Sequence, residues 1–297
     1  MSNHISAGFD LDTVEKPLTG SPDSSGQKLW VRDDPEYLFF NSIFIEKDPE
    51  SARKRGIYRY ILMKSIIIIP TYNEKENIEK LIEEIRKLNR DFHVLIIDDN
   101  SPDSTGRIAD RLAGKHSEVS VIHRRGKLGL GTAYITGFKY ALENNYDLVF
   151  TMDADFSHQP KYLIDLMEKA KEYDLVIGSR YIKDGGIQNW PLHRLILSQG
   201  ANIYVRMVTR LPIFDSTGGF NCYRREVLEK IALHTIISDG YAFQIEMKYR
   251  LWKKGFSLKE VPVTFIDRAR GASKISKKII FQAFFLVWKL LCRGSIH

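Results

Sequence analysis

The sequence is short of cysteine, of long apolar runs and of N-terminal targeting signals. Only Cys222 and Cys292 are present, which argues against a disulfide framework or a cysteine metal site and favours a reducing compartment. No stretch reaches the roughly eighteen consecutive apolar residues that a membrane-spanning helix needs. The beginning of the chain lacks the basic and then apolar pattern of a signal peptide.

Acidic residues are absent after Asp267, so this end of the chain is strongly basic. Its cations are Arg268, Arg270, Lys274, Lys277, Lys278, Lys289 and Arg293. Such a segment indicates anionic partners: phosphates, nucleic acid or an acidic lipid surface. The chain of 297 residues, with 43% hydrophobic and 27% charged residues, is otherwise ordinary for a soluble globular protein of one large or two small domains.

Glycine is missing where a dinucleotide-binding enzyme would need it. The fingerprint G-x-G-x-x-G follows the first strand of such enzymes, but here that strand is followed by PTYNE, residues 70–74. A glycine-rich loop, GKLGLG at residues 126–131, comes only after the third strand and lacks the G-K-[ST] of a P-loop. Hydride transfer and ATP hydrolysis are therefore disfavoured.

The first 62 residues read differently from the remainder. They are polar and rich in Ser, Gly and Asp, which is typical of a disordered or loosely held arm. Within them, residues 37–45 are apolar enough to dock as a strand or a short helix, and the pattern does not choose between these. We expect an N-terminal extension over 1–62 that is dispensable for chemistry, a folded catalytic domain over 63–266, and a basic loop with an amphipathic tail over 267–297.

From residue 65 onward, apolar runs alternate with helical periodicity. Strands are expected at 65–69, 92–97, 119–123, 148–152 and 175–178, and helices within 73–89, 105–113, 132–144 and 160–173. Short connections between strands that are apolar on both faces predict a doubly wound, mostly parallel α/β sheet with helices on both sides. Ligands bind such sheets beyond the carboxyl ends of the strands. Polar clusters at 70–72, 98–99 and 153–155 fall there.

The cluster Asp153-Ala154-Asp155 follows the fourth strand. Residues two apart on a strand share a face, so the two carboxylates should point the same way and repel each other. A divalent cation would relieve that repulsion, and oxygen ligands suit Mg²⁺ or Mn²⁺. The motif alone allows a capped strand end with acidic loop residues equally well.

Ordered motifs between Lys64 and Lys274 carry a resemblance to a known family. They are IIIIPTYNEKENI, LIIDDNSPDSTG, HRRGKLGLGTAYITGF, MDADFSHQP, GSRYIKDGG, NWPLHR, GGFNCYRREVLE, GYAFQIEMKYR and EVPVTFIDRARGASK. This series resembles inverting GT-A-type glycosyltransferases, and more narrowly the dolichol-phosphate (polyprenol-phosphate) mannose synthases. The resemblance implies a GT-A (Rossmann-like) fold and transfer of mannose from GDP-mannose to a polyprenyl (dolichyl) monophosphate. Alternatives are transfer of glucose or another hexose from another nucleotide sugar, or a non-catalytic nucleotide-binding scaffold.

The resemblance also implies roles for residues at the strand ends. The donor nucleotide would be held by Pro70, Tyr72, Glu74, Ile97, Asp99, Asp153, Ala154, Asp155, Arg180, Arg268 and Lys274, whereas Asp98 would be structural. Asp153 and Asp155 would bind the metal. Some relatives carry Gln two positions after the second aspartate, where this chain has Ser157, so metal coordination by Ser157 or by a water in its place stays open.

Arg180 and Arg194 resemble the arginines that hold the acceptor phosphate, so Asp155, Arg180 and Arg194 are the candidate catalytic residues. A phosphate oxygen is anionic near neutral pH, so no general base is required. Arg268 and Lys274 resemble a flexible loop that closes on the donor diphosphate. The sugar pocket would be lined by Asp215, residues 218–220, Gln244 and Glu246, with a brace for the loop as the alternative role of Asp215. His123, His158 and His193 are read as structural or surface residues.

A polyprenol acceptor lies in a bilayer, so the protein is expected to bind its surface peripherally. Residues 194–212 are amphipathic, and residues 277–293 are apolar over about fourteen positions between flanking cations. This tail is expected to be the main anchor, and the alternative is a terminal helix folded onto the domain. The expected location is the cytoplasmic face of a prokaryotic plasma membrane or of the endoplasmic reticulum, with small membrane-anchoring subunits as further candidate partners. No nucleic-acid partner is expected, because the cations interleave with aliphatic residues and no stacking platform accompanies them.

Overall fold

The computed structural model describes residues 63–88, 90–236, 238–267, 287, 288 and 290. The expectations for 1–62, for Arg268 and Lys274, and for most of the tail lie outside these residues. Among the described helices, none is both long and apolar enough to cross a membrane.

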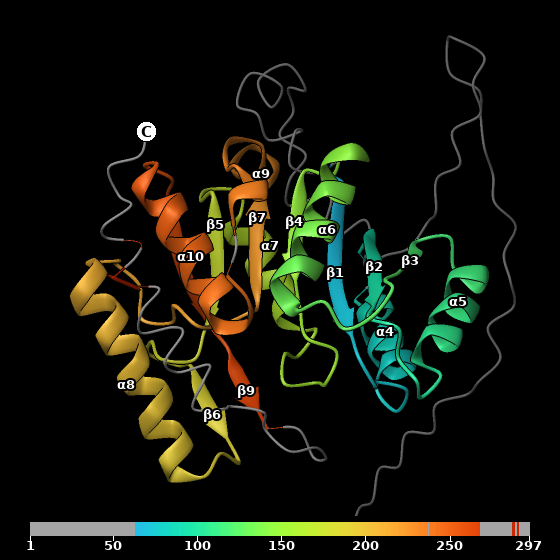
Figure 1. The fold of residues 1–297 in the computed structure, drawn as a ribbon, viewed down its shortest axis with the longest axis horizontal. Coiled ribbons are helices and arrows are strands. Elements are labelled where there is room, and N and C mark those ends of the chain that lie inside the picture. The colour runs from blue at the N-terminus through green and yellow to red at the C-terminus, as the bar shows by residue number, and fades with distance from the viewer. Residues whose placement is uncertain (1–62, 89, 237, 268–286, 289, 291–297) are drawn as a thin grey trace, which may run out of the picture. The chain divides into compact units, whose positions relative to one another are not determined.

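A seven-stranded sheet with the order β3-β2-β1-β4-β7-β5-β8 forms the centre of the domain (Figure 1). Its strands are β1 (Ser65–Thr71), β2 (Phe92–Asp98), β3 (Val119–His123), β4 (Leu148–Thr151), β5 (Leu175–Ser179), β7 (Asn221–Arg224) and β8 (Leu258–Pro262). Among the strands described in this sheet, β7 alone runs antiparallel to its neighbours, which are β4 and β5. The other pairs of neighbouring strands are parallel. The predicted mostly parallel α/β sheet is confirmed, and each of the five expected strands is present; the antiparallel β7 was not predicted.

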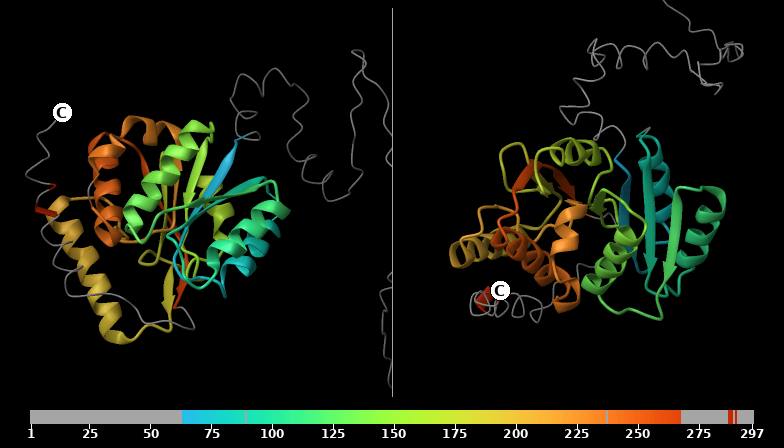
Figure 2. Two further views of the ribbon diagram at one scale, coloured as in Figure 1. Left: turned by 45° about the vertical axis from the view of Figure 1, so that its right-hand side comes forward. Right: turned by 90° about the horizontal axis from the view of Figure 1, so that it is seen from above.

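Helices cover both faces of the sheet, as the view from above shows (Figure 2). They are α4 (Ile78–Arg86), α5 (Thr105–Lys115), α6 (Leu130–Glu143), α7 (Tyr162–Lys169), α8 (Leu192–Thr209), α9 (Arg225–Lys230) and α10 (Gly240–Lys253), with a 3-10 turn at Leu233–Thr235. Alternation along β1 explains the two layers, since Ile66 and Ile68 pack with α6, α9 and α10, whereas Ile67 and Ile69 pack with α4, α5 and α7.

Close approach between α6 and β1 depends on one glycine. A Cβ placed on Gly137 would lie 2.6 Å from the Cγ2 of Ile68, far inside van der Waals contact. The four isoleucines of β1 are at most 1% exposed, so a displaced α6 would open a void beside a deeply buried strand. This packing fixes α6, and hence the loop that precedes it, relative to the strand ends.

A two-stranded parallel ribbon, β6 (Gly186–Gln188) with β9 (Thr264–Ile266), lies beside α8 at one end of the domain (Figure 1). In the main sheet β2, β1 and β4 are neighbours, so their carboxyl ends meet at one edge. Tyr72 and Asp99 follow β1 and β2 directly, and Asp153 follows β4 after one residue. The topology therefore brings together the three polar clusters that lie at residues 70–72, 98–99 and 153–155 of the sequence.

Candidate active site

Two aspartates follow β4 and are held in different ways. Asp155 Oδ1 accepts both the hydroxyl of Ser157, at 2.5 Å, and its backbone N–H, at 3.1 Å. Phe156, between them, adopts a left-handed conformation with φ of 61°, which turns Ser157 back toward Asp155. Ser157 is 2% exposed, so this side chain orients the Asp155 carboxylate from within the protein.

Asp153 is oriented by two neighbours. Its backbone N–H donates to Nδ1 of His158 at 3.0 Å, and Tyr134 donates its hydroxyl to Asp153 Oδ1 at 3.3 Å. Burial lowers the pKa of His158, although the nearby aspartates oppose this shift, so the ring is neutral with its proton on Nε2. Burial and the charge of Asp153 raise the pKa of Tyr134 well above its usual value, which keeps the hydroxyl a donor.

His158 was read from the sequence as structural or surface, and the structure places it inside the site. Its ring stacks on Phe220, with centroids 5.0 Å apart and an angle of 13° between the planes, and meets the Phe265 ring edge-on at 5.7 Å. Sequence reasoning missed its contact with Asp153 because the bond depends on the loop geometry after β4.

The oxygens of Asp153 and Asp155 suit a hard divalent cation. Within the described residues, no cluster of three or more His, Cys, Asp or Glu side chains forms a metal site. An ion held here would therefore take its remaining ligands from water, from a hydroxyl such as that of Ser157, or from a bound anion. This arrangement fits Mg²⁺ or Mn²⁺, which proteins often bind through one or two carboxylates together with substrate phosphates.

The loop after β1 forms an aromatic wall. The Lys127 ammonium lies 4.2 Å from the centroid of the Tyr72 ring, so the glycine-rich loop reaches over this side chain. Glu74 is anchored through its backbone N–H, which donates to the Thr105 hydroxyl at 2.9 Å, and its carboxylate accepts from Asn77 at 2.8 Å. Pro70 is half-buried at the end of β1.

Asp99, at the end of β2, is bound on both oxygens by Arg124. The Nε–Oδ1 distance is 2.5 Å and the Nη2–Oδ2 distance is 2.6 Å. Arg124 also donates to the carbonyl of Gly129 and to the hydroxyl of Thr132. Asp99 therefore ties the glycine-rich loop to the edge of the sheet. The neighbouring Asp98 accepts hydrogen bonds from Ser101 and Thr71, so its carboxylate is engaged within the protein.

The far side of the glycine-rich loop is held by Asp239 at the start of α10. Its carboxylate accepts the backbone N–H of Gly131 at 2.7 Å, and a Cβ on Gly129 would lie 2.6 Å from it. Gly129 also has a φ of 97°, which disfavours any other residue. Gly129 and Gly131 therefore allow the backbone of this loop to lie close to the Asp239 carboxylate.

Arg180, just after β5, is buried and paired with Asp215. Two bonds of 2.7 Å join Nε and Nη2 to the two carboxylate oxygens, and a third, of 2.9 Å, joins Nη2 to the Thr217 hydroxyl. Burial disfavours the charged form of Asp215, but the charges of Arg180 and Lys248 and the hydrogen bonds from Arg180 together lower the pKa of Asp215 to about 2. The pair stays ionised over the whole physiological range.

Arg194, on α8, lies near Arg180 because both contact Trp190. The Trp190 ring centroid is 3.9 Å from the Arg194 guanidinium carbon and 5.7 Å from that of Arg180. Arg194 Nη1 donates to both oxygens of Asp267, at 2.9 and 3.0 Å. The two predicted arginines are thus brought together. Sequence reasoning missed Trp190, whose position between them could be suspected only from its place in the NWPLHR motif.

The loop between α8 and β7 closes the site behind Asp153. A Cβ on Gly219 would lie 3.9 Å from Asp153 Oδ1 and 3.5 Å from Gln244 Nε2. Gln244 Oε1 accepts from Asn221, while its buried Nε2 makes no hydrogen bond to the described residues. This amide group lies close to Asp153, and it can donate a hydrogen bond to an acceptor on a bound molecule. Glu246, in contrast, is paired with Arg250 and bonded to Ser238.

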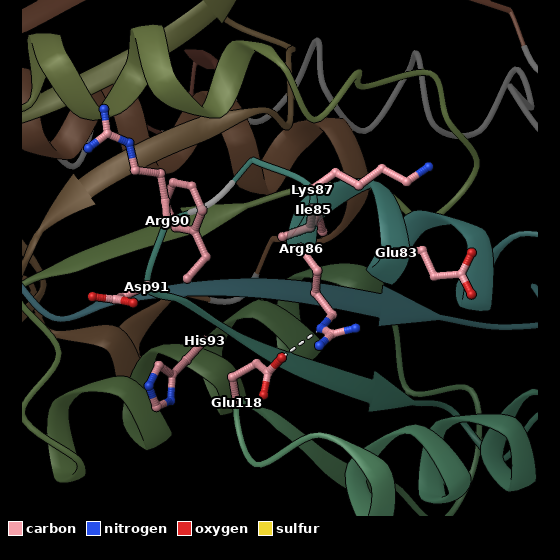
Figure 3. Close-up of a pocket in the computed structure, with 9 residues that line it drawn as sticks. Glu83, Ile85, Arg86, Lys87, Arg90, Asp91, His93 and Glu118 are labelled. Atoms are coloured by element: carbon pink, nitrogen blue, oxygen red, sulfur yellow. Dashed lines mark hydrogen bonds and ion pairs between the residues drawn. The ribbon is translucent and has the colours of Figure 1, made fainter. Parts of the chain in front are cut away.

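A hollow of about 720 Å³ lies at the opposite end of the strands (Figure 3). It is lined by Glu83, Ile85, Arg86, Lys87, Arg90, Asp91, Phe92, His93 and Glu118. Its charges are of mixed sign, and two of its lining residues, Arg86 and Glu118, form an ion pair at 2.7 Å. None of the residues predicted for the active site lines it, and these residues lie instead at the carboxyl edge of the sheet.

That edge combines a pair of carboxylates, an aromatic wall and two arginines on one tryptophan. Such a set can bind a nucleotide diphosphate with a divalent cation on one side and a phosphate monoester on the other. Among the described residues at this edge, no serine or cysteine is paired with a general base as in a hydrolase. The site is therefore suited to group transfer between phosphorylated substrates.

Comparisons with known proteins agree with this geometry. The model of the family described as glycosyl transferase family 2 matches residues 66–232. A polyprenol monophosphomannose synthase of Mycolicibacterium smegmatis is 44% identical over 235 residues, 78% of this chain and 89% of that protein. An undecaprenyl-phosphate mannosyltransferase of Micrococcus luteus is 42% identical over 233 residues, 78% of this chain and 96% of that protein.

The fold is similar to that of glucosyl-3-phosphoglycerate synthase from Mycobacterium tuberculosis, solved with Mn²⁺, UDP and glucosyl-3-phosphoglycerate. The TM-score is 0.57 at 18% identity, over 80% of this chain and 81% of that one. At this identity the likeness concerns the arrangement of helices and strands.

Proposed function

This chain is a member of glycosyltransferase family 2, and we propose that it transfers mannose from GDP-mannose to a polyprenyl monophosphate, with inversion at the anomeric carbon. The observation that carries the proposal is the 44% identity with polyprenol monophosphomannose synthase over 89% of that protein. The carboxylates and arginines at the carboxyl edge of the sheet are the groups that such a transfer needs.

The donor nucleoside binds between the loop after β1 and the end of β2. Its contacts are Pro70, Tyr72 and Glu74 on one side and Ile97 and Asp99 on the other. The ion pair with Arg124 holds the Asp99 carboxylate in one orientation before the nucleotide arrives, which reduces the entropy lost on binding. Gln244 Nε2, buried beside Gly219, donates to a hydroxyl of the sugar.

Asp153 and Asp155 would hold Mg²⁺ or Mn²⁺, with Ala154 close to the nucleotide. An ion held there would supply Lewis-acid chemistry, neutralising charge on the diphosphate leaving group. Ser157 orients Asp155 through the two bonds to Oδ1, and His158 and Tyr134 orient Asp153. The carboxylates are thereby fixed in direction, so little reorganisation is needed when the cation and diphosphate bind.

The acceptor phosphate attacks the anomeric carbon from the face opposite the diphosphate. The new bond joins a phosphate oxygen to that carbon, and the bond to the diphosphate oxygen breaks, releasing GDP with its electron pair. Arg180 and Arg194 hold the phosphate in line, which is the main requirement when the nucleophile is already an anion. Arg268 and Lys274, outside the described residues, supply further positive charge to the donor diphosphate.

Helix α8 has an exposed apolar face that can contact the acceptor lipid. Leu192, Ile196, Ile203 and Met207 recur at spacings of four and seven, and each is at least 56% exposed. Arg194 is on the same helix and is 12% exposed at its side chain. The proposed arrangement has this face on the surface of a bilayer, with Arg194 reaching the lipid phosphate from the protein side.

The decisive experiment is incubation of the purified protein with radiolabelled GDP-mannose and a short-chain polyprenyl phosphate, with Mn²⁺ or with EDTA. Radiolabel should enter the organic phase only with the cation. UDP-glucose serves as the second donor and tests transfer of another hexose. A folded protein that transfers from no nucleotide sugar would favour a non-catalytic scaffold.

A further inference from the structure

We propose that Lys248 is a positioning residue for this transfer: through three backbone carbonyls it sets the loop 215–219, and with it Arg180, against Asp153. The inference rests on the proposed function, because it concerns how the acceptor arginine is placed. Lys248 lies on α10, is 0% exposed and was not singled out from the sequence.

The loop 215–218 is irregular backbone that is nevertheless buried, so each of its polar groups needs a partner inside the protein. On the N–H side, Glu260 accepts from Phe214 and Asp215 at 2.9 and 2.8 Å, and Asn202 accepts from Ser216 at 2.8 Å. Asp215 Oδ1 accepts from Gly218 at 3.0 Å.

On the carbonyl side, one ammonium group serves three acceptors. Lys248 Nζ lies 3.2, 3.3 and 2.6 Å from the carbonyl oxygens of Asp215, Ser216 and Gly218. A protonated lysine has three N–H donors, which equals the number of carbonyls that it meets. Its carbonyl contacts thus span most of the turn.

This lysine is ionised in a place where ionisation is costly. Burial lowers its pKa to about 8, while Asp215 and Glu260 favour the charged form and Arg180 disfavours it. Lysine is almost never fully buried unless its charge is paired. The charge is retained here because it completes the hydrogen bonding of the Asp215, Ser216 and Gly218 carbonyls in a buried loop.

The same loop holds both halves of the reaction site. Asp215 and Thr217 bind the Arg180 guanidinium, and Thr151 donates its hydroxyl to the Gly219 carbonyl at 2.6 Å, next to Asp153. A turn released at its carbonyls would move Arg180 relative to the acid pair. Misplacement by about 1 Å can cost on the order of a hundredfold in rate.

The test compares Lys248→Met, which keeps the length of the side chain without its charge, with Lys254→Met, which removes an exposed lysine at the end of the same helix. We expect Lys248→Met to lower kcat on the order of ten- to a hundredfold and to raise KM for the polyprenyl phosphate. The Kd for GDP with Mn²⁺ should change less than about twofold, because Tyr72 and Asp99, the proposed contacts of the nucleoside, lie on other loops. Lys254→Met should behave as the wild type.

A second measurement decides the matter if Lys248→Met does not fold. A neutral lysine has two N–H donors for three carbonyls, so wild-type kcat should fall as pH rises through about 8. Lys248→Arg, which stays charged, should recover activity and lose this alkaline limb. Normal kcat in Lys248→Met, or a wild-type limb that persists unchanged in Lys248→Arg, would overturn the inference while leaving mannosyl transfer by the wild type intact. Failure of the wild type to transfer would instead refute the proposed function.

Discussion

Arg194 Nη1 donates to both carboxylate oxygens of Asp267, at 2.9 and 3.0 Å, while its guanidinium lies on the ring of Trp190. A carboxylate and a phosphate offer an arginine similar geometry and charge. Asp267 therefore occupies the hydrogen-bonding position that the acceptor phosphate is proposed to take. Binding of the acceptor has to displace or share this partner.

Replacing Asp267 by Asn should tighten acceptor binding. The neutral amide competes less well for Arg194, so KM for the polyprenyl phosphate should fall about threefold or more, with kcat changed less. Steady-state kinetics at fixed, saturating GDP-mannose measure both. Asp165→Asn, at an exposed position on α7, is the matched control. A rise in KM would mean that Asp267 helps Arg194 to bind phosphate.

Removing one charge from the acid pair should abolish transfer. Asp155→Asn keeps the bonds to Ser157 possible but loses a full negative charge toward the cation, so kcat should fall at least about a hundredfold. The affinity for Mn²⁺ in the presence of GDP, followed by calorimetry, should weaken in parallel. Near-normal turnover in the variant would refute the assignment of Asp155 as a metal ligand.

The buried pair of Arg180 and Asp215 should make stability depend on pH in the acidic range. The pKa of Asp215 is lowered to about 2 from its ordinary 3.8, so the native state binds this proton less readily than the unfolded state. The resulting contribution, about 2 kcal/mol, is present above pH 3.8 and is lost as pH falls through 2.

Urea unfolding of the wild type and of Asp215→Asn measures this contribution. At pH 7 the variant should be less stable by about 3–5 kcal/mol, because Arg180 is left buried without its counter-charge. The gap should narrow as pH is lowered from 5 toward 2. A gap that is constant with pH would show that Asp215 stabilises the fold through its shape and hydrogen bonds alone.

Much of this architecture could be predicted, and the limits have physical causes. Ser65–Ile69 and Phe92–Ile97 are continuous apolar runs, so their burial in a parallel sheet follows from composition. The strand β7 was missed because Asn221–Arg224 is short and half polar, and its pairing with β4 and β5 is decided by tertiary contacts. Local pattern carries no information about such a partner.

The site residues divide in the same way. The placement of Asp99 and Asp153 at one edge follows from topology, whereas their partners do not. Arg124 binds Asp99 from 25 residues away, and Asp215 binds Arg180 from 35. Lys248 illustrates the limit most clearly, since lysine is ordinarily exposed and only the folded loop shows why this one is not.

The exposed face of α8 should govern binding to membranes and leave the chemistry alone. Ile196 is 60% exposed, so Ile196→Gln removes apolar contact without opening the core. Sedimentation with vesicles rich in anionic lipid should weaken by about threefold or more, whereas transfer to a short acceptor in detergent should be unchanged. Ile196→Leu is the control. Equal sedimentation of both variants would mean that another part of the chain binds the bilayer.

The link between Asp99 and the glycine-rich loop makes a prediction that a double-mutant cycle can resolve. Arg124→Met frees both Asp99 oxygens and also releases the carbonyl of Gly129, so the Kd for GDP should rise about tenfold. Asp99→Asn should have a comparable effect. If the two act as one unit, the double variant should bind GDP no more weakly than either single variant, a coupling of more than about 1 kcal/mol. Arg107→Met, which removes an exposed arginine on α5, should leave the Kd unchanged. If the losses in GDP binding free energy were additive, Arg124 and Asp99 would contact the nucleotide separately. The ion pair between them would then form only in the absence of the nucleotide.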